Sequence, residues 1–261
     1  MRLLNWNLEY APPAGARGRA ITEVIEGHGA DVVCLTETHV SWPMDGGHWI
    51  WADSDYGYEH RGDRRKVRLW SRAPWMDVDA VGHLDLPGGR FVAGVTQTDI
   101  GEVTCLGVCI PWRAAHVSTG RGDRKPWQDH VTYLEILADV IREQSGSGRL
   151  VVVGDFNQRI PRRYTPKAVH DVLLATFAPL TIVTAGAVSG LEGGVIDHVA
   201  LGPGLAANGV TGISRMVDGR RVSDHDGVVV DVRDRLRVPQ SAGVWETASM
   251  LWPSGSRTKA P

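Results

Sequence analysis

Cysteine is scarce in this sequence, and long hydrophobic runs are missing. The three cysteines all lie in apolar segments without Cys-x-x-Cys spacing, which argues against a disulfide framework and a cysteine zinc site. No stretch of about 18 uninterrupted apolar residues is present, although a membrane-spanning helix needs that length. Residues 1–7 have the pattern of a strand and not of a secretory signal. We therefore expect a cytoplasmic protein with no membrane span.

A strong charge of either sign is missing as well, and so is an internal linker. The formal net charge is −2 and the pI is near 6.5, so we expect no global attraction to polyanions. No Pro/Gly/Ser-rich segment divides the middle of the chain, and no solenoid repeat is visible. These features predict one domain over residues 1–238. Residues 239–261 are expected to form a tail that is either docked or disordered.

Predicted strands outnumber predicted helices. Helical patterns occur around residues 20–25, 127–141 and 165–177. Short runs rich in β-branched residues predict strands at residues 3–7, 31–37, 67–70, 91–97, 103–110, 150–154, 195–201 and 228–232. This ratio favours two packed sheets with outer helices over a Rossmann sheet, although periodicity alone does not separate a sandwich from another mixed fold.

Side chains suited to phosphate-ester hydrolysis lie at the ends of several apolar runs. That reaction needs a cation on the phosphoryl oxygens, an aligned and deprotonated water, and help for the leaving oxygen. Carboxylate and amide oxygens suit Mg²⁺, and strand ends hold such groups rigidly. The candidate positions are Asn7 with Glu9, Glu37, Asp155 with Asn157, Asp197 with His198, and Asp224 with His225.

Each of these positions alone also has an ordinary structural explanation. Asp155 and Asn157 follow a buried strand two residues apart and so share one face, yet Asp and Asn are also the commonest turn residues. Glu37 alone would be an exposed strand end, and Asp224-His225 alone a capped turn. The catalytic interpretation therefore depends on the whole set.

Taken together, the segments resemble the endonuclease/exonuclease/phosphatase family of deoxyribonuclease I-like metal-dependent phosphoesterases. The resemblance covers residues 1–232, and the motifs follow the family's order: Trp6-Asn7, Leu35-Thr36-Glu37, Gly154-Asp155-Phe156-Asn157, Ile196-Asp197-His198 and Ser223-Asp224-His225. The resemblance implies a four-layer α/β/β/α sandwich, in which two mixed β-sheets pack face to face with helices outside.

The resemblance also implies a metal site. Glu37 would be the principal ligand of Mg²⁺, with Mn²⁺ as a substitute. Asn7 and Glu9 would complete the metal and phosphate environment, and Asp224 would be a further ligand.

Catalytic roles follow from the same resemblance. Asp197 would orient His225 and raise its pKa toward the protonated form, which stabilises phosphoryl charge. Asp155 and Asn157 would position and activate the attacking water. The family pattern leaves open how base duty divides between Asp155 and His225, and we favour Asp155.

The sequence departs from the family at one position. Many members have a His or Tyr on or just beyond a central strand, where this chain reads Cys109-Ile110-Pro111-Trp112-Arg113. Arg113 or His116 would be the substitute donor to the phosphate, although either is more often a solvated loop residue.

Basic and aromatic residues surround the motifs. Three basic clusters, at residues 61–72, 121–125 and 159–163, have a solvated surface as their ordinary explanation. The last two lie in loops next to motif-bearing strands and would form a rim that draws in a polyanionic substrate, with Arg121, Arg124 and Lys125 as the candidate residues. Four tryptophans lie in predicted loops or edges, where rings could stack on unpaired bases: Trp42, Trp49, Trp51 and Trp112. Core packing is the commoner role for such residues.

The leading hypothesis is a Mg²⁺-dependent nuclease or phosphodiesterase acting on a phosphate ester, with nucleic acid as the favoured substrate. The alternative is a phosphomonoesterase or a sphingomyelinase-like lipid phosphodiesterase, for which we identify no apolar membrane-facing loop. A non-catalytic binding module on the same scaffold is a third hypothesis. It would be favoured by a missing Glu37 or a missing His/Asp pair, and both are present.

Overall fold

The computed structural model describes residues 1–59 and 61–235. The end of the predicted domain at residue 238 and the predicted tail at residues 239–261 lie outside the described residues. Two six-stranded sheets form the centre of the molecule. Within the described ranges, no helix is both long enough and apolar enough to cross a membrane.

The first sheet has the strand order β11-β14-β1-β2-β4-β3. It is mixed, since β1 pairs in parallel with β2 and antiparallel with β14. Its strands are β1 (Arg2–Asn7), β2 (Val32–His39), β3 (His48–Trp51), β4 (Arg64–Ser71), β11 (Leu205–Ile213) and β14 (Gly227–Asp234).

The second sheet has the order β5-β6-β7-β8-β10-β9. It is also mixed, because β8 pairs in parallel with β7 and antiparallel with β10. Its strands are β5 (Trp75–Asp79), β6 (Phe91–Thr98), β7 (Gly101–Cys109), β8 (Leu150–Asp155), β9 (Thr181–Ile182) and β10 (Asp197–Leu201).

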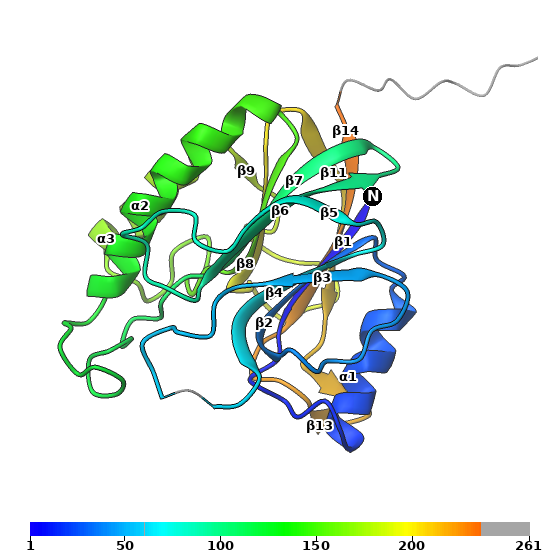
Figure 1. Ribbon diagram of the computed structural model, residues 1–261, viewed down its shortest axis with the longest axis horizontal. Coiled ribbons are helices and arrows are strands. Elements are labelled where there is room, and N and C mark those ends of the chain that lie inside the picture. Colours follow the sequence, from blue (N-terminus) through cyan, green and yellow to red (C-terminus); the bar gives the residue numbers. More distant parts are fainter. Residues whose placement is uncertain (60, 236–261) are drawn as a thin grey trace, which may run out of the picture.

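Helices cover the outer face of each sheet. Figure 1 shows α1 (Ala16–Gly27) on one side of the molecule and α2 (Gln128–Gln144) with α3 (Lys167–Thr176) on the other. Ile21 and Ile25 of α1 pack in one core cluster with Leu4 of the first sheet. A one-turn helix, η1 (Ser145–Ser147), follows α2, and a small hairpin is formed by β12 (Met216–Val217) and β13 (Arg220–Arg221).

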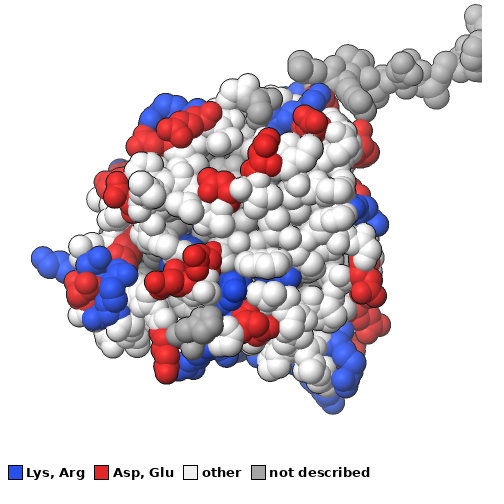
Figure 2. All heavy atoms as spheres, viewed as in Figure 1, with Lys and Arg blue, Asp and Glu red and all other residues white. Residues whose placement is uncertain are grey.

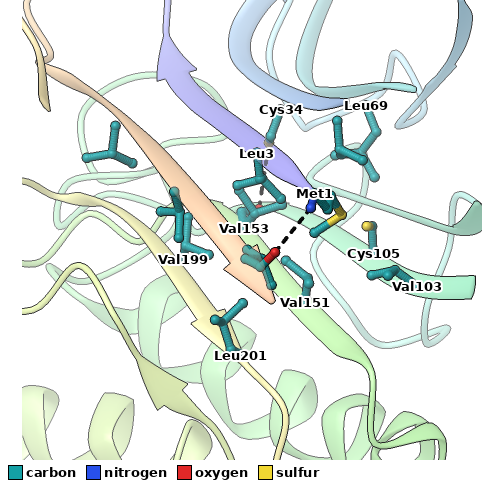
Figure 3. Packing of buried hydrophobic residues seen from close by; sticks show 14 of the residues in the cluster. Met1, Leu3, Cys34, Leu69, Val103, Cys105, Val151, Val153, Val199 and Leu201 are labelled. Carbon is teal, nitrogen blue, oxygen red and sulfur yellow. Dashed lines mark hydrogen bonds between the residues drawn. The ribbon is translucent and has the colours of Figure 1, made fainter. Parts of the chain in front are cut away.

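The inner core lies between the two sheets. Figure 3 shows Leu3, Cys34 and Leu69 of the first sheet among Val151 and Val199 of the second. All three cysteines are free and buried, as the sequence predicted. A further apolar cluster fills the space between the second sheet and its helices. Helix, sheet, sheet and helix therefore form four layers, which confirms the α/β/β/α sandwich.

The two sheets are also tied together by a buried polar contact near one edge. Asn5 Nδ2 donates to the carbonyl oxygens of Gly154 at 3.0 Å and of His198 at 3.3 Å, so β1 is linked to β8 and β10. At Gly154 φ is +146°, and a Cβ there would lie 1.8 Å from the carbonyl oxygen of Val108. Only glycine fits this position, so the backbone immediately before Asp155 is fixed.

Candidate active site

Strand ends from both sheets bring the predicted polar residues to one edge of the sandwich. Asn7 is the last residue of β1, and Glu37 lies near the end of β2. Asp155 ends β8 and Asp197 begins β10, and the two are directly paired in the antiparallel register. His225 lies just before β14. Residues far apart in sequence therefore converge because the parallel strands end where the antiparallel ones begin.

Asp155 is buried and held by three donors. Its Oδ2 accepts hydrogen bonds from Asn7 Nδ2 at 3.1 Å and from Asn157 Nδ2 at 2.9 Å, and its Oδ1 accepts the backbone N–H of Asn157 at 2.9 Å. Burial, followed by the charges of Asp197 and Glu37, raises the pKa of Asp155 to about 7, although His225 acts in the opposite direction. A carboxylate with this pKa suits a general base near neutral pH.

Asp197 and His225 form a direct ion pair. His225 Nδ1 donates to Asp197 Oδ2 at 2.5 Å, and the Asp197 side chain is completely buried. Burial alone would lower the pKa of His225, but the charges of Asp197 and Asp155 outweigh it and raise the pKa to about 10. His225 is therefore an imidazolium at neutral pH and is fixed in orientation by its partner.

The backbone around His225 is fixed by two further contacts. Ser223 Oγ donates to the carbonyl oxygen of Asn7 at 2.6 Å and accepts the N–H of His225 at 3.1 Å. Trp6 Nε1 donates to the carbonyl oxygen of His225 at 2.9 Å. The Trp6-Asn7 motif therefore holds the Ser223-Asp224-His225 motif in place.

Glu37 has a basic partner that the sequence did not reveal. Lys66 Nζ on β4 donates to Glu37 Oε1 at 2.7 Å, and the Lys66 side chain is buried. Burial acts to raise the pKa of Glu37, but the charge and hydrogen bond of Lys66 dominate, with His225 and the buried Arg90 contributing, and hold it below its ordinary value. Glu37 is therefore an anion, with one oxygen bound to Lys66.

The acidic oxygens of the cluster fit a hard divalent cation. Asp155, Asp197 and His225 place their ligand-type atoms within 4.8 Å of one another, but His225 is bound to Asp197 as an imidazolium and therefore has no lone pair for a metal. The carboxylates raise one another's pKa, and Asp197 Oδ1 is buried without a hydrogen-bond partner among the described residues. The His225 imidazolium offsets part of the repulsion among these buried acidic groups, and a divalent cation would offset more. Carboxylate oxygens are the ligands that Mg²⁺ prefers.

Glu9 and Asp224 lie at the margin of this cluster. The two carboxylate oxygens of Glu9 pair with Arg17 at 2.8 Å and with Arg221 at 2.7 Å, while its backbone N–H donates to Asn7 Oδ1 at 2.9 Å. Asp224 is exposed, with Oδ1 3.8 Å from His225 Nε2. The structure thus brings Asp224 next to His225 and turns the Glu9 carboxylate toward two arginines.

His198 belongs to a buried hydrogen-bond network beside the loop that follows β8. Its Nε2 contacts the carbonyl oxygen of Gln158 at 3.0 Å, and its Nδ1 contacts Thr184 Oγ1 at 2.9 Å. Burial lowers its pKa to about 4. The Gln158 side chain in turn contacts His130 and His170. His198 therefore supports the loop that carries Asp155 and does not face the acidic cluster.

Arg113 and His116, the predicted substitute donors, differ in burial. Arg113 is exposed. His116 is buried, packs on the Tyr58 ring with centroids 4.4 Å apart, and has its Nε2 4.0 Å from Asp129. Arg90 is a basic group that the sequence reasoning missed. Its guanidinium is buried and donates to the carbonyl oxygen of Cys109 at 3.3 Å, beside the position where the family has His or Tyr.

The predicted basic rim divides into two kinds of residue. Arg124 Nε binds Asp129 Oδ1 at 2.7 Å, Arg121 Nη2 binds Asp129 Oδ2 at 3.3 Å, and the Asp129 side chain is buried at the start of α2. Lys125 is exposed. Two of the three basic side chains therefore anchor their loop to α2, and Lys125 has its charge in solvent.

We expect Arg124→Gln to lower the free energy of unfolding by about 1–2 kcal/mol, because the buried Asp129 loses one of its donors. Lys125→Gln is the matched control and should leave the melting temperature unchanged while raising KM for a polyanionic substrate. Thermal unfolding and steady-state kinetics measure the two effects. Equal melting temperatures for the two variants would remove the anchoring role of Arg124.

Comparison with known proteins gives the same fold. The family model described as Endonuclease/Exonuclease/phosphatase family matches residues 4–225. No curated protein sequence matches the chain. A variant of the 3' phosphatase NExo from Neisseria, solved with a product DNA hairpin, is 19% identical with a TM-score of 0.63, over 88% of this chain and 98% of that chain.

Two further solved structures have the same architecture. An AP endonuclease from Archaeoglobus fulgidus has a TM-score of 0.64 at 13% identity, over 88% of this chain and 98% of its own. The human Nocturnin catalytic domain with bound sulfate has a TM-score of 0.66 at 13% identity, over 90% and 93%. The sandwich, the order of its motifs and the family match over residues 4–225 together show that this chain belongs to the endonuclease/exonuclease/phosphatase family.

Proposed function

We propose that this protein is a Mg²⁺-dependent phosphodiesterase that cleaves nucleic acid. The observation that carries the proposal is the position of Asp155, a buried carboxylate with a pKa of about 7, beside the His225–Asp197 ion pair. Hydrolysis of a phosphate ester requires a general base and a positively charged group held in place. Asp155 would be the base and the His225 imidazolium the charged group, both at the same edge of the sandwich.

Glu37, Asn7 and Asp224 would hold the cation, because their oxygens come from the ends of β1 and β2 and from the loop before β14. Mg²⁺, or Mn²⁺ in its place, would supply Lewis-acid stabilisation of the phosphoryl oxygens. Lys66 would set the orientation of Glu37 through the hydrogen bond to Oε1. Glu9 would contribute through its backbone N–H, which fixes the Asn7 amide, while its carboxylate binds arginines.

Asp155 would accept the proton of the attacking water. Asn7 and Asn157 donate to its carboxylate from two sides and so hold it in one orientation. His225 is charged already, so it would stabilise the negative charge on the phosphoryl group and would not act as the base. This division of roles follows because burial and charge bring the pKa of Asp155 to about 7 and that of His225 to about 10, so at neutral pH Asp155 has a well-populated form that accepts a proton and His225 does not.

Nucleic acid is favoured as the substrate by the similarity to the Neisseria enzyme solved with a DNA hairpin. The distribution of charge on the surface bears on how the substrate would be bound. On the face drawn in Figure 2, acidic and basic side chains alternate in small groups around a broad uncharged area. A polyanion would therefore be bound by a few basic residues near the site and not by a uniform positive field.

A panel of substrates tests the proposal. The purified protein with Mg²⁺ would be incubated with plasmid DNA, single-stranded DNA, RNA, a 3'-phosphorylated oligonucleotide, sphingomyelin vesicles and a chromogenic phosphodiester. Cleavage of a nucleic acid backbone is the expected result. Activity only on the 3'-phosphate would indicate a phosphomonoesterase, activity only on vesicles would indicate a lipid phosphodiesterase, and no activity on any substrate would contradict the proposal.

We expect chelation to abolish activity and Mg²⁺ or Mn²⁺ to restore it. Glu37→Gln should raise the Mg²⁺ concentration for half-maximal activity by about tenfold or more, since removing a ligand weakens a site at least as much as removing a supporting group does. Glu26→Gln on the exposed face of α1 is the matched control. Full activity of the wild type in excess chelator would remove Glu37 from this role.

A further inference from the structure

A cavity of about 470 Å³ lies beside Glu37 and is not used by the catalytic groups. It shares a wall with the site, because Lys66 lines it and also donates to Glu37. Its other walls come from the segment after β1, from the loop between β3 and β4, and from the loop between β7 and α2. The lining residues are Tyr10, Tyr56, Tyr58, Glu59, Arg61, Arg64, Lys66, Trp112, Thr119 and Gly120.

Aromatic rings form much of the lining, and contacts between the loops hold them. Tyr56 and Tyr58 have ring centroids 6.0 Å apart, and Tyr58 packs on His116. The Tyr58 hydroxyl accepts the backbone N–H of His116 at 3.1 Å, which ties the two loops together. Trp112 is 47% exposed, so its ring is available to a ligand. The arrangement is a set of flat surfaces around one hollow.

The charges around the cavity are mainly positive. Arg61, Arg64 and Lys66 line it against one carboxylate, Glu59. The Arg64 guanidinium lies 4.5 Å above the Tyr10 ring, and no carboxylate among the described residues pairs with it. Lys66 is bound to Glu37 and Arg61 lies 3.8 Å from Glu59, so Arg64 is the lining cation without a carboxylate partner among the described residues.

We propose that this cavity binds an unpaired nucleotide adjoining the scissile phosphate, with the base on Trp112 and a flanking phosphate on Arg64. The proposal rests on the proposed function and narrows its substrate class to single-stranded or locally unpaired nucleic acid. Rings beside guanidinium groups are the surfaces on which unpaired bases stack. Paired bases in a duplex are stacked on both faces and would not enter a hollow.

The residues that line the cavity favour a nucleotide over a lipid as the ligand. No lining residue has an aliphatic side chain that would cover an acyl chain, apart from the stems of its charged groups. An apolar tail would contact the rings but would leave the arginine without an anion, whereas a nucleotide presents a ring to the aromatic walls and a phosphate to the arginine.

Direct binding tests the proposal without hydrolysis. The affinity of a short fluorescein-labelled oligothymidine would be measured by fluorescence anisotropy in excess chelator, next to a matching strand with base-free sugars. Trp112→Ala should weaken binding of oligothymidine by about tenfold, within the range for one stacked base, and should leave the base-free strand unchanged. Arg64→Gln should weaken both strands and reduce the salt dependence, because phosphate is present in both.

Two variants serve as controls. Trp51→Ala removes an exposed tryptophan of β3 outside the cavity, and Arg142→Gln removes an exposed arginine of α2. Both should bind like the wild type. An equal loss for Trp112→Ala on the two strands, no loss on either, or failure of the wild type to bind oligothymidine would overturn the proposal. Failure of the wild type to cleave any phosphate ester would instead contradict the proposed function, and the binding result would remain interpretable.

Discussion

Asp155→Asn is expected to lower kcat by about 10³-fold, in the middle of the range for a positioned general base. The change keeps the shape of the side chain but removes the carboxylate that would accept a proton from water. Asn7 and Asn157 should still hold the new side chain through its remaining oxygen, so the fold should persist. Single-turnover kinetics would show the loss in the chemical step.

Asp139→Asn on the exposed part of α2 is the matched control, and its kcat should equal that of the wild type. Circular dichroism and thermal unfolding would verify that both variants are folded. If Asp155→Asn kept more than about a tenth of the wild-type kcat, a loss well below that of a general base, the base would have to be sought elsewhere. His225 would then be the first group to consider.

His225→Ala and Asp197→Ala are each expected to lower kcat by about 10²-fold or more, and the double variant should be little worse than either. The reason is the direct hydrogen bond of 2.5 Å between them, through which Asp197 orients and charges the imidazole. Residues that act as one unit show such non-additive losses, whereas independent groups multiply theirs.

His83→Ala is the control for loss of a histidine that pairs with an aspartate outside the site, since His83 is exposed and lies 3.7 Å from Asp85. Its kcat should be unchanged. Strictly multiplicative losses for Asp197 and His225 in folded variants would show that the two act independently, and the orienting role of Asp197 would be lost.

The strands that the sequence predicted are mainly those at the centre of each sheet. The run at residues 150–154 contains consecutive valines, so its pattern identified the buried strand β8 directly. The strands β3, β5, β9 and β11 of the two sheets were missed. All four are edge strands, and β11 contains Asn208, Gly209 and Gly212, which are typical of turns.

The interpretation of the basic run at residues 61–72 as solvated surface holds for Arg61 and Arg72, which are exposed, and was wrong for two other members. Lys66 and Arg68 are buried, Lys66 against Glu37 and Arg68 with its guanidinium 3.8 Å from the Trp49 ring centroid. Charged residues are almost never fully buried without a partner, and those partners lie on other strands. A single sequence contains no information on strand register, so such pairs could not be foreseen.

The candidate site also has a part that could be predicted from the sequence and a part that could not. The ends of apolar runs indicated Asn7, Asp155, Asp197 and His225 as candidates, and the resemblance to the family implied that they converge at one site. The Glu9 pairs could not, because Arg17 comes from α1 and Arg221 from β13, and their meeting depends on the packing of a helix and a hairpin. The local sequence pattern predicts which polar residues lie at the ends of strands. Tertiary packing determines which charged residues they pair with.

The position of β1 affects how the protein is made. This strand lies between β14 and β2, with Arg2 opposite Asp231, so the ribosome produces β1 well before its neighbour β14. Until β14 emerges, the nascent chain holds β1 with an unpaired edge, which is a site for aggregation. A chain that stops before β14 lacks a central strand of the sheet that carries Asn7 and Glu37. Premature termination in that region should therefore yield aggregated protein and no partially active fragment.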